Sequence, residues 1–346
     1  MKVGSPIPKV ATPQNFKVRS QYATFPDMRL VVATHGHCFD GLASAVLFTR
    51  LMERTNEEPL ELSYRACGYG GGQARADEAM LDGDQNAILD YRYTATDRLS
   101  WYFDHHRTAF GSDDDRAHFE ARKENGHFFY DAECSSCTKL IDRVAREHLG
   151  VADLGLGELV AWADRIDSAR FQSAAEAVDR SNPVMRLVSV VEHYGDDAFL
   201  TKLVPELLTR PLSEVAESPE IAARYRPLGK KHERFVDRVK KSSLRQGRVV
   251  FVDLTEEVLD SVGKFVTYAL FPDSVYSVIV GLLKHGPKIS VGYNPWSGRP
   301  LDTDISSICA RYGGGGHPVV GGIAFSNTEI ERARSVARDI AAELQG

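Results

Sequence analysis

The sequence is poor in cysteine, carries no net positive charge and contains no long apolar run. Its five cysteines are odd in number and irregularly spaced, and Cys134-x-x-Cys137 lacks the second such pair that a structural zinc site needs. This usage favours a reducing, cytoplasmic environment. The formal net charge of −6 gives no overall basic field for nucleic acid, and we expect neither a signal peptide nor a membrane span.

What is present indicates a globular protein of ordinary composition. The chain has 346 residues, of which 43% are hydrophobic and 26% charged, and this favours two domains with an ample core. Apolar runs of strand length alternate with helical periodicities, so we expect an α/β fold whose N-terminal part contains a parallel sheet. Residues 1–28 contain four prolines and are predicted to form an irregular arm.

The first predicted strand leads into a polar loop. An apolar run over residues 30–33 predicts the strand, and helical spacing over residues 42–52 predicts a helix after the loop. His35, His37 and Asp40 lie between them, in the position of a ligand loop of an α/β fold. An alternative for Asp40 is that it caps the helix, which is a common role of aspartate.

Two later strands end in residues that can bind metal. A second strand is predicted near residues 60–65 and a glycine-rich turn follows it; the third strand then ends at Asp90. The apolar run Trp101–Phe103 leads directly into Asp104-His105-His106, and the spacing from Asp90 predicts a short helix in between. Ligands of open α/β sheets bind at the carboxyl ends of the strands, and imidazole with carboxylate suits manganese, iron, cobalt or zinc. The alternative is a pair of solvated histidines.

The middle of the sequence is predicted to be helical. Residues 111–126 are an exception and are predicted to form an acidic surface loop, with the aspartates at 113–115 solvated. A helix over residues 156–166 brings Asp164 and Asp167, one of which could reach the metal-binding residues while the other pairs with a nearby arginine. A charged helix over residues 221–243 is predicted to connect the two domains.

The C-terminal part combines strands and helices with a glycine tract. Strands are predicted at 249–253, 276–282 and 288–293, and helices at 260–270, 304–311 and 328–343. Four glycines precede His317, and their backbone N–H groups suit an oxyanion such as phosphate, to which His317 can add a bond. The alternative is a flexible loop, although glycine carries an entropic cost of ordering.

Three of these motifs together resemble the DHH/DHHA1 phosphoesterase superfamily. They are Asp40-Gly41-x-x-Ser44-Ala45, Asp104-His105-His106 after a strand, and Gly314-Gly315-Gly316-His317 near the end of the sequence. Members of that family include single-strand exonucleases, nano-RNases, cyclic-dinucleotide phosphodiesterases and nucleotide phosphatases. The resemblance implies a DHH domain over residues 29–200, a helical connector over 201–245 and a smaller α/β DHHA1 domain over 246–346.

The resemblance also implies roles for individual residues. Two divalent ions would be bound, and Mn²⁺ is the expected metal. His106, Asp104 and His317 would be the catalytic residues, with Asp104 orienting the histidines. The glycines of the tract, together with His317, would hold the substrate phosphate. The expected metal ligands are Asp40, Asp90, His105 and Asp167, with Asp164 as the second choice for the last position.

The first motif departs from the family pattern. A second aspartate is expected two residues before or after Asp40, where this sequence has Cys38 and Leu42. His35, His37 or the Cys38 thiolate could replace that carboxylate, or one metal site could be weak or lost. Softer ligands favour Zn²⁺, Fe²⁺ or Co²⁺. The serine-arginine pattern of the substrate domain is also missing, so phosphate contacts are expected from Asn294 or Arg299.

We therefore expect a metal-dependent phosphoesterase that hydrolyses short single-stranded oligonucleotides or small phosphorylated substrates with metal-activated water. One alternative is a degenerate binding module that keeps the phosphate clamp without the chemistry. Another is a nucleic-acid-binding scaffold that uses the basic residues between Lys230 and Lys241. No membrane partner is expected, and the oligomeric state is left open, with a homodimer as one alternative.

Overall fold

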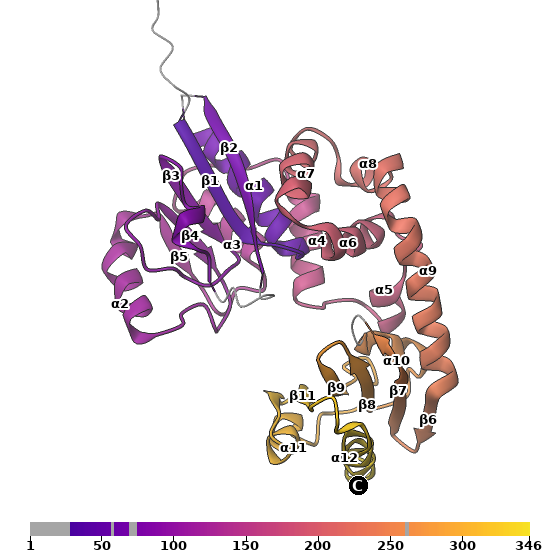
Figure 1. Ribbon diagram of the computed structural model, residues 1–346. Helices are drawn as coiled ribbons and strands as arrows, with labels where there is room; N and C mark the ends of the chain where they lie inside the picture. The colour runs from indigo at the N-terminus through magenta and orange to yellow at the C-terminus, as the bar shows by residue number, and fades with distance from the viewer. Residues whose placement is uncertain (1–27, 57–58, 69–74, 260–262) are drawn as a thin grey trace, which may run out of the picture.

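The computed structural model describes residues 28–56, 59–68, 75–259 and 263–346. The predicted N-terminal arm, most of the glycine-rich turn after the second strand and the predicted start of a helix at Asp260 lie outside these residues. Two sheets with separate hydrophobic cores form two domains, and the long helix α9 (Pro219–Ser242) runs along one side from the first to the second (Figure 1). The predicted α/β architecture is confirmed.

The N-terminal sheet has five parallel strands in the order β2-β1-β3-β4-β5. Residues 30–33 of β1 have no exposed surface, as expected for a parallel sheet covered on both faces. In this strand order the direction of winding reverses between β1 and β3, and open α/β sheets bind ligands at that point. The strands are β1 (Met28–His35), β2 (Leu60–Cys67), β3 (Gln85–Leu89), β4 (Trp101–Asp104) and β5 (Phe128–Tyr130).

Two predictions for the segments between these strands were wrong. Residues 90–100, all of which the structure describes, contain turns and no helix, so β3 and β4 are joined by a loop. The acidic segment forms a helix, α2 (Asp113–Arg122). Ser112 caps its N-terminus, and the negative charges of three aspartates in its first turn interact favourably with the helix dipole. Asp115 is not solvated but buried, and it accepts a bond from the backbone of Gly111.

The remaining helices of this domain cover the sheet and extend its core. α1 follows β1 directly and is buried along most of its length, where α3, α4 and α7 pack against it. These helices are α1 (Phe39–Thr55), α3 (Cys137–Glu147), α4 (Gly157–Asp167), α5 (Ala174–Val178), α6 (Pro183–Tyr194), α7 (Asp197–Thr209) and α8 (Leu212–Ala216).

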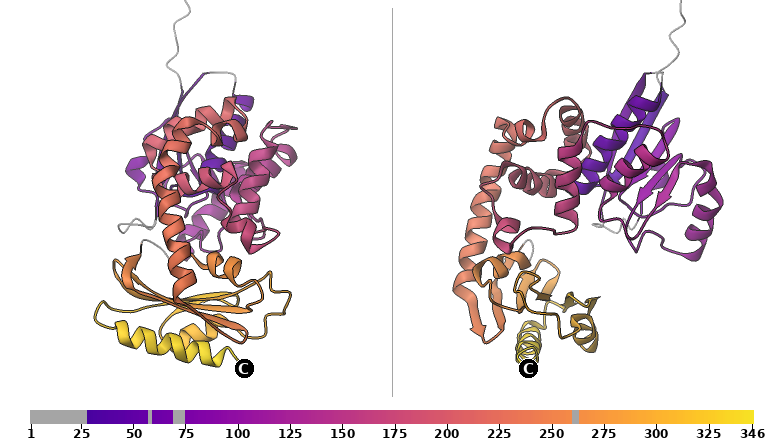
Figure 2. Two further views of the ribbon diagram at one scale, coloured as in Figure 1. Left: turned by 90° about the vertical axis from the view of Figure 1, so that its right-hand side faces the viewer. Right: turned by 180° about the vertical axis from the view of Figure 1, so that it is seen from behind.

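The C-terminal domain is built on a six-stranded mixed sheet in the order β10-β11-β9-β8-β7-β6. The helix α12 packs across β7, β8 and β9, and Figure 2 shows it lying along one face of the sheet. The elements are β6 (Ser243–Gln246), β7 (Val249–Leu259), α10 (Lys264–Leu270), β8 (Tyr276–Leu283), β9 (Gly286–Tyr293), α11 (Ile305–Arg311), β10 (Gly315–His317), β11 (Val320–Ala324) and α12 (Ile330–Glu343).

The N-terminal core continues beyond the expected boundary at residue 200. Leu203, Leu212 and Ile221 are buried in the same cluster as the sheet, so we propose that the connector is α9 alone. The domains also touch directly, because the indole N–H of Trp296 donates a 2.8 Å hydrogen bond to the carbonyl of Phe171. Among the described residues, no helix has both the length and the apolar character needed to cross a membrane.

Candidate metal centre

Acidic and imidazole side chains gather at the carboxyl ends of β1, β3 and β4, the edge of the sheet that faces the C-terminal domain in Figure 1. In the register of the sheet, Thr34 of β1 lies beside Leu89 of β3, so the next residues, His35 and Asp90, leave the two strands side by side. Asp104 ends β4 on the other side of β3. The cluster therefore lies at the switch point of the sheet.

Asp90 lies at the centre of this cluster. It has a positive φ of 55°, which turns its side chain out of the strand, and its backbone N–H is held by the Phe103 carbonyl at 2.9 Å. Its carboxylate is 1% exposed, yet neither oxygen accepts a hydrogen bond from any described residue. Burial raises the pKa of Asp90, but the histidines around it outweigh this and hold it well below its usual range. A buried charge without hydrogen bonds is costly, so this carboxylate requires positive charge beside it, from an imidazolium or a metal ion.

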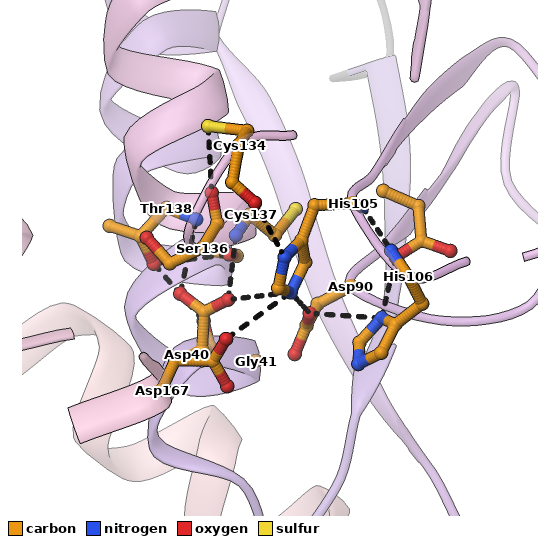
Figure 3. Close-up of polar contacts among 12 residues, drawn as sticks. Asp40, Gly41, Asp90, His105, His106, Cys134, Ser136, Cys137, Thr138 and Asp167 are labelled. Carbon is orange, nitrogen blue, oxygen red and sulfur yellow. Dashed lines mark hydrogen bonds and ion pairs between the residues drawn. The ribbon is translucent and has the colours of Figure 1, made fainter. Parts of the chain in front are cut away.

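Nε2 of His105 faces that carboxylate. Nδ1 lies 3.1 Å from the carbonyl of Cys134, and a bond there places the proton on Nδ1 and directs the lone pair of Nε2 into the cluster (Figure 3). Nε2 lies 3.4 Å from Asp90 and from Asp167, and 3.7 Å from Asp40. A lone pair among three carboxylates is repulsive unless a proton or a metal ion lies between them.

Asp40 is held by a helix other than its own. Its two oxygens accept bonds from the backbone N–H groups of Cys137 at 2.7 Å and Thr138 at 3.1 Å, in the first turn of α3. The alternative that Asp40 caps α1 is wrong, because Cys38 is the N-cap residue of that helix. A Cβ on Gly41 would lie 2.1 Å from the carbonyl of His35, so only glycine lets α1 start this close to β1.

Asp104 orients both histidines. Its Oδ1 accepts bonds from the backbone N–H of His105 at 2.8 Å and from Nδ1 of His106 at 2.7 Å, while its Oδ2 accepts the hydroxyl of Tyr102 at 3.0 Å. Sequence analysis missed Tyr102, although strand alternation places it on the same face as Asp104. Nε2 of His106 takes no part in this bond, and the His106 side chain is 30% exposed.

The described residues form three overlapping ligand groups. In each of them three donor atoms lie within 4.8 Å of one another, and the groups are His35, Cys38 and Asp90; Asp90, His105 and His106; and Asp40, His105 and Asp167. Asp90 is shared by the first two groups and His105 by the last two, and these two side chains lie 3.4 Å apart. These are nitrogen, sulfur and oxygen donors of the kinds that divalent transition metals take. The residues fit a centre with two neighbouring ions.

The pKa values show how much negative charge is concentrated here. Burial, followed by Asp90 and Asp167, raises the pKa of Asp40 well above its usual range, and burial followed by Asp90 raises that of Asp167. Burial lowers the pKa of His105, but its bond and charge interactions with Asp90, Asp40 and Asp167 outweigh this and raise it to about 10. Burial, Asp90 and Asp40 raise the pKa of the Cys38 thiol. These four shifts favour added protons, the same positive charge that a bound cation provides.

Two of the expected ligands are placed away from the cluster. His37 has a positive φ of 56° and is exposed, with Nδ1 3.3 Å from the carbonyl of Glu192. Asp164 lies on the same helix as Asp167, but its carboxylate is bound by Ser135 and by Lys139 at 3.1 Å. Neither residue belongs to a described group that could hold a metal.

The glycine tract lies in the other domain and forms a hairpin rather than a loop. Gly315 to His317 make the edge strand β10, paired with β11, and His317 is exposed. A Cβ on Gly314 would lie 2.3 Å from the carbonyl of Gly322, so close packing explains part of the tract without a ligand. Gly315 has open space beside it, and no packing contact explains its identity.

The other expected phosphate contacts differ in their availability. Asn294 is fully buried, and its amide donates to the carbonyls of Pro272 and Ser274, so it is not available to a substrate. Arg299 is exposed in the turn after β9. None of the described hydrogen bonds and ion pairs joins His317 or Arg299 to the metal-binding cluster.

The fold is similar to two solved structures that each align over most of this chain. The pGpG-specific phosphodiesterase PggH from Vibrio cholerae aligns with a TM-score of 0.62 and 20% identity over 91% of this chain and 99% of its own. RecJ from Thermus thermophilus, solved in complex with Mn²⁺, aligns with a TM-score of 0.54 and 13% identity over 91% of this chain. The chain spans about half of that RecJ, 52% of its length.

At these identities the similarity shows the fold, and the fold is the one that the motifs predict. No protein-family model matches the sequence, and no curated protein matches it either. The order of strands and the position of the acidic and histidine residues therefore carry the functional argument.

Proposed function

We propose that the chain is a divalent-metal-dependent phosphohydrolase of the DHH/DHHA1 superfamily that cleaves phosphoester bonds of short oligonucleotides or small nucleotide-type substrates. The observation that carries the proposal is the buried carboxylate of Asp90, which faces His35, His105 and His106 without accepting a hydrogen bond from any described residue. The similarity in fold to a pGpG-specific phosphodiesterase and to RecJ supports the substrate class.

The cluster would hold two ions. Asp40, His105 and Asp167 offer only oxygen and nitrogen, which suits Mn²⁺, the ion present in the RecJ structure. His35 and Cys38 offer nitrogen and sulfur, which favours Zn²⁺, Fe²⁺ or Co²⁺ at the second position. Bound ions supply a Lewis acid for the phosphoryl oxygen and lower the pKa of a water molecule to produce the nucleophile.

The chain's own residues prepare the substrate side of this site. The bond from Nδ1 to Asp104 fixes the ring of His106 and leaves Nε2 to meet a substrate oxygen. Burial lowers the pKa of His106, but its bond to Asp104 and the charge of Asp90 outweigh this and raise it, so the protonated form is favoured. A protonated His106 can donate to a phosphoryl oxygen and stabilise charge in the transition state.

The C-terminal domain would supply the remaining phosphate contacts. We assign these to the backbone N–H groups from Gly314 to Gly316, to His317 and to Arg299, because glycine permits close approach of backbone and both side chains are exposed. The five cysteines are all free, which supports the proposal of a reducing, cytoplasmic environment.

The degenerate binding module is supported by one feature only, the cysteine at position 38. Against it, Asp40, Asp90, His105 and Asp167 are all present and converge. The nucleic-acid scaffold is less favoured, because the basic residues of α9 are interspersed with acidic ones and the net charge is −6.

The test is a metal-dependent hydrolysis assay on purified protein, stripped with chelator and reloaded with Mn²⁺, Zn²⁺, Fe²⁺ or Co²⁺. Dinucleotides, cyclic dinucleotides, 3′-phosphoadenosine phosphate and p-nitrophenyl phosphate are the substrates. We expect turnover with at least one metal, and we expect Cys38→Asp to shift preference toward Mn²⁺ while Cys38→Ser weakens binding of the softer ions. Absence of turnover with every metal would favour the binding module.

A further inference from the structure

A cavity of about 750 Å³ lies in the corner where the two domains meet α9. Its walls come from α5 and α6 of the N-terminal domain, from α9, and from α10 and the end of β7, which gather on one side of the molecule in Figure 1. None of the residues of the metal-binding cluster lines it. Glu192 in the cavity wall contacts His37 through its backbone carbonyl, and His37 lies two residues after His35 of the metal-binding cluster.

The cavity wall concentrates positive charge in an acidic protein. Arg180, Lys231, Arg234 and Arg238 line it, against only two carboxylates among the described residues. One of these, Glu257, is paired with Arg238 at 3.2 Å. Among the described lining residues, four cationic side chains therefore share the wall with two acidic ones, and this excess of positive charge attracts an anionic ligand.

Arg180 is half-buried in the cavity wall. Its guanidinium donates to the backbone carbonyls of Ala177 and Asp179 and is attracted by the charges of Glu192 and Asp179, but it forms no ion pair within 4.0 Å of a described carboxylate. Burial lowers the pKa of Arg180. Burial and the charge of Arg180 together lower the pKa of the neighbouring His232. An anion in the cavity would stabilise this half-buried cation.

Another part of the wall is apolar and aromatic. Phe235 of α9, Phe265 of α10 and Leu228 are half-buried there, and Val266 is buried. Phe265 is held by Trp296, with ring centroids 5.6 Å apart in an edge-on arrangement. Aromatic surface in the same cavity as a group of cations suits a ligand with a flat ring at one end and a phosphate at the other.

We propose that this cavity is a second ligand site that binds a nucleoside phosphate, with the phosphate near Arg180 and Lys231 and the base against Phe235 and Phe265. The choice of a nucleoside rests on the proposed function, whereas the choice of an aromatic anion rests on the side chains of the cavity. Because the walls belong to both domains and to the connector, the bound ligand fixes their relative position, as at a hinge.

The binding test uses the full-length Asp90→Asn protein in chelator, so that the metal centre contributes nothing. Calorimetric titration with adenosine and guanosine 5′-monophosphates, inorganic phosphate and adenosine should show that the nucleotides bind at least about 10-fold more tightly than phosphate or nucleoside alone. Arg180→Gln and Lys231→Gln should each weaken nucleotide binding about 10-fold, and Ser189→Phe, which fills the cavity, should abolish it. Arg332→Gln, an exposed arginine on α12, is the matched control and should bind as the parent does.

Two sources of the nucleotide are distinguished with the metal-loaded wild-type chain. If the cavity holds the far nucleoside of the substrate, Ser189→Phe raises KM for a dinucleotide but not for p-nitrophenyl phosphate. If it holds a separate effector, adenosine monophosphate changes the rate with p-nitrophenyl phosphate without competing with it.

The proposal is overturned if no nucleotide binds the metal-free protein, or if binding is the same in Arg180→Gln, Lys231→Gln and Ser189→Phe, with circular dichroism showing that the variants are folded. If the enzyme is active but shows no such nucleotide binding, only the proposed ligand site in the cavity is overturned. If the chain binds nucleotide through Arg180 but hydrolyses none of the substrates, only the proposed function is overturned.

Discussion

Oδ1 of Asp90 and Nε2 of His105 face each other at 3.4 Å, both buried, and neither atom has a hydrogen-bond partner among the described residues. The two side chains are brought there by the ends of β3 and β4, which are adjacent in the sheet. Such a pair is unfavourable in a folded chain unless a proton or a metal ion lies between the two atoms. The raised pKa of His105 supplies that proton in the metal-free chain, so both the stability and the activity of the protein should depend on this pair.

Asp90→Asn tests this dependence. The variant should lose hydrolysis by at least about 10³-fold, about 4 kcal/mol in activation free energy, because two of the three ligand groups lose an oxygen donor. In chelator it should also unfold at a lower temperature than wild type near neutral pH, because the folded state holds the pKa of Asp90 below its usual range and so gains stability from the charged form. Calorimetry and the hydrolysis assay measure the two effects. Wild-type rates, or an unchanged or higher unfolding temperature in chelator, would contradict the assignment.

Asp167 and Asp164 form a matched pair one turn apart on α4. Asp167→Asn should reduce turnover at least about 10²-fold without lowering the unfolding temperature, since burial and Asp90 raise the pKa of its carboxyl and its ion-pair partner among the described residues is His105. Asp164→Asn should keep turnover within about threefold and lose less than about 1 kcal/mol of stability, because it weakens the ion pairs to Lys139 and Arg170 but keeps an oxygen for Ser135. Equal rate losses in the two variants would show that α4 acts through its fold and not through a ligand.

Gly315 and Gly314 separate a binding role of the glycine tract from a packing role. Gly314→Ala should destabilise the protein by about 1–3 kcal/mol, because the new Cβ meets the carbonyl of Gly322. Gly315→Ala has room for the methyl group, so its stability should stay within about 0.5 kcal/mol, while KM rises at least about 10-fold. Urea unfolding and steady-state kinetics measure these effects. A wild-type KM in Gly315→Ala would remove the tract from the substrate site.

Tyr64 gives a pH-dependent stability prediction away from the metal centre. It is buried between β2 and α1, where its hydroxyl bonds Thr49 at 2.9 Å, and burial raises the pKa of Tyr64 to about 12. Between the ordinary tyrosine pKa of about 10 and this raised value, the unfolded chain has lost the proton and the folded chain has kept it, so stability falls as pH rises. Tyr64→Phe should be less stable at about pH 8 by about 1 kcal/mol, from the lost bond, but should lose about 2 kcal/mol less than wild type by about pH 12. Parallel pH dependences in urea unfolding would contradict the buried hydroxyl.

Some wrong predictions of secondary structure came from giving too little weight to local sequence signals. The sequence Ser112-Asp113-Asp114-Asp115 is a helix start, with a capping hydroxyl and acids in the first turn, yet its acidity suggested a solvated loop. The absence of a helix between β3 and β4, where every residue is described, is a different case. Parallel strands usually need a helical crossover, and here a loop with buried tyrosines, Tyr91 and Tyr93, packs against the sheet instead.

Other features could not be read from a single sequence, because they depend on contacts between distant residues. Asp40 lies at the start of one helix but holds the start of another, 97 residues further along. From the sequence alone, His35 and His37 are equally plausible ligands. The register of β1 with β3 selects His35, and the positive φ of His37 turns its ring away.

The order of motifs along the chain was enough to predict an α/β fold, the strand ends that carry Asp90 and the Asp104-His105-His106 run, and the position of a candidate metal site, because strand ends in parallel sheets share one edge. Only the folded chain decided which carboxylate of α4 faces His105, that Cys38 and His35 share Asp90, and that a charged cavity lies where the two domains meet α9. Local periodicity sets which segments become strands and helices. Long-range packing sets which side chains come within a few ångströms of one another, and chemistry depends on that separation.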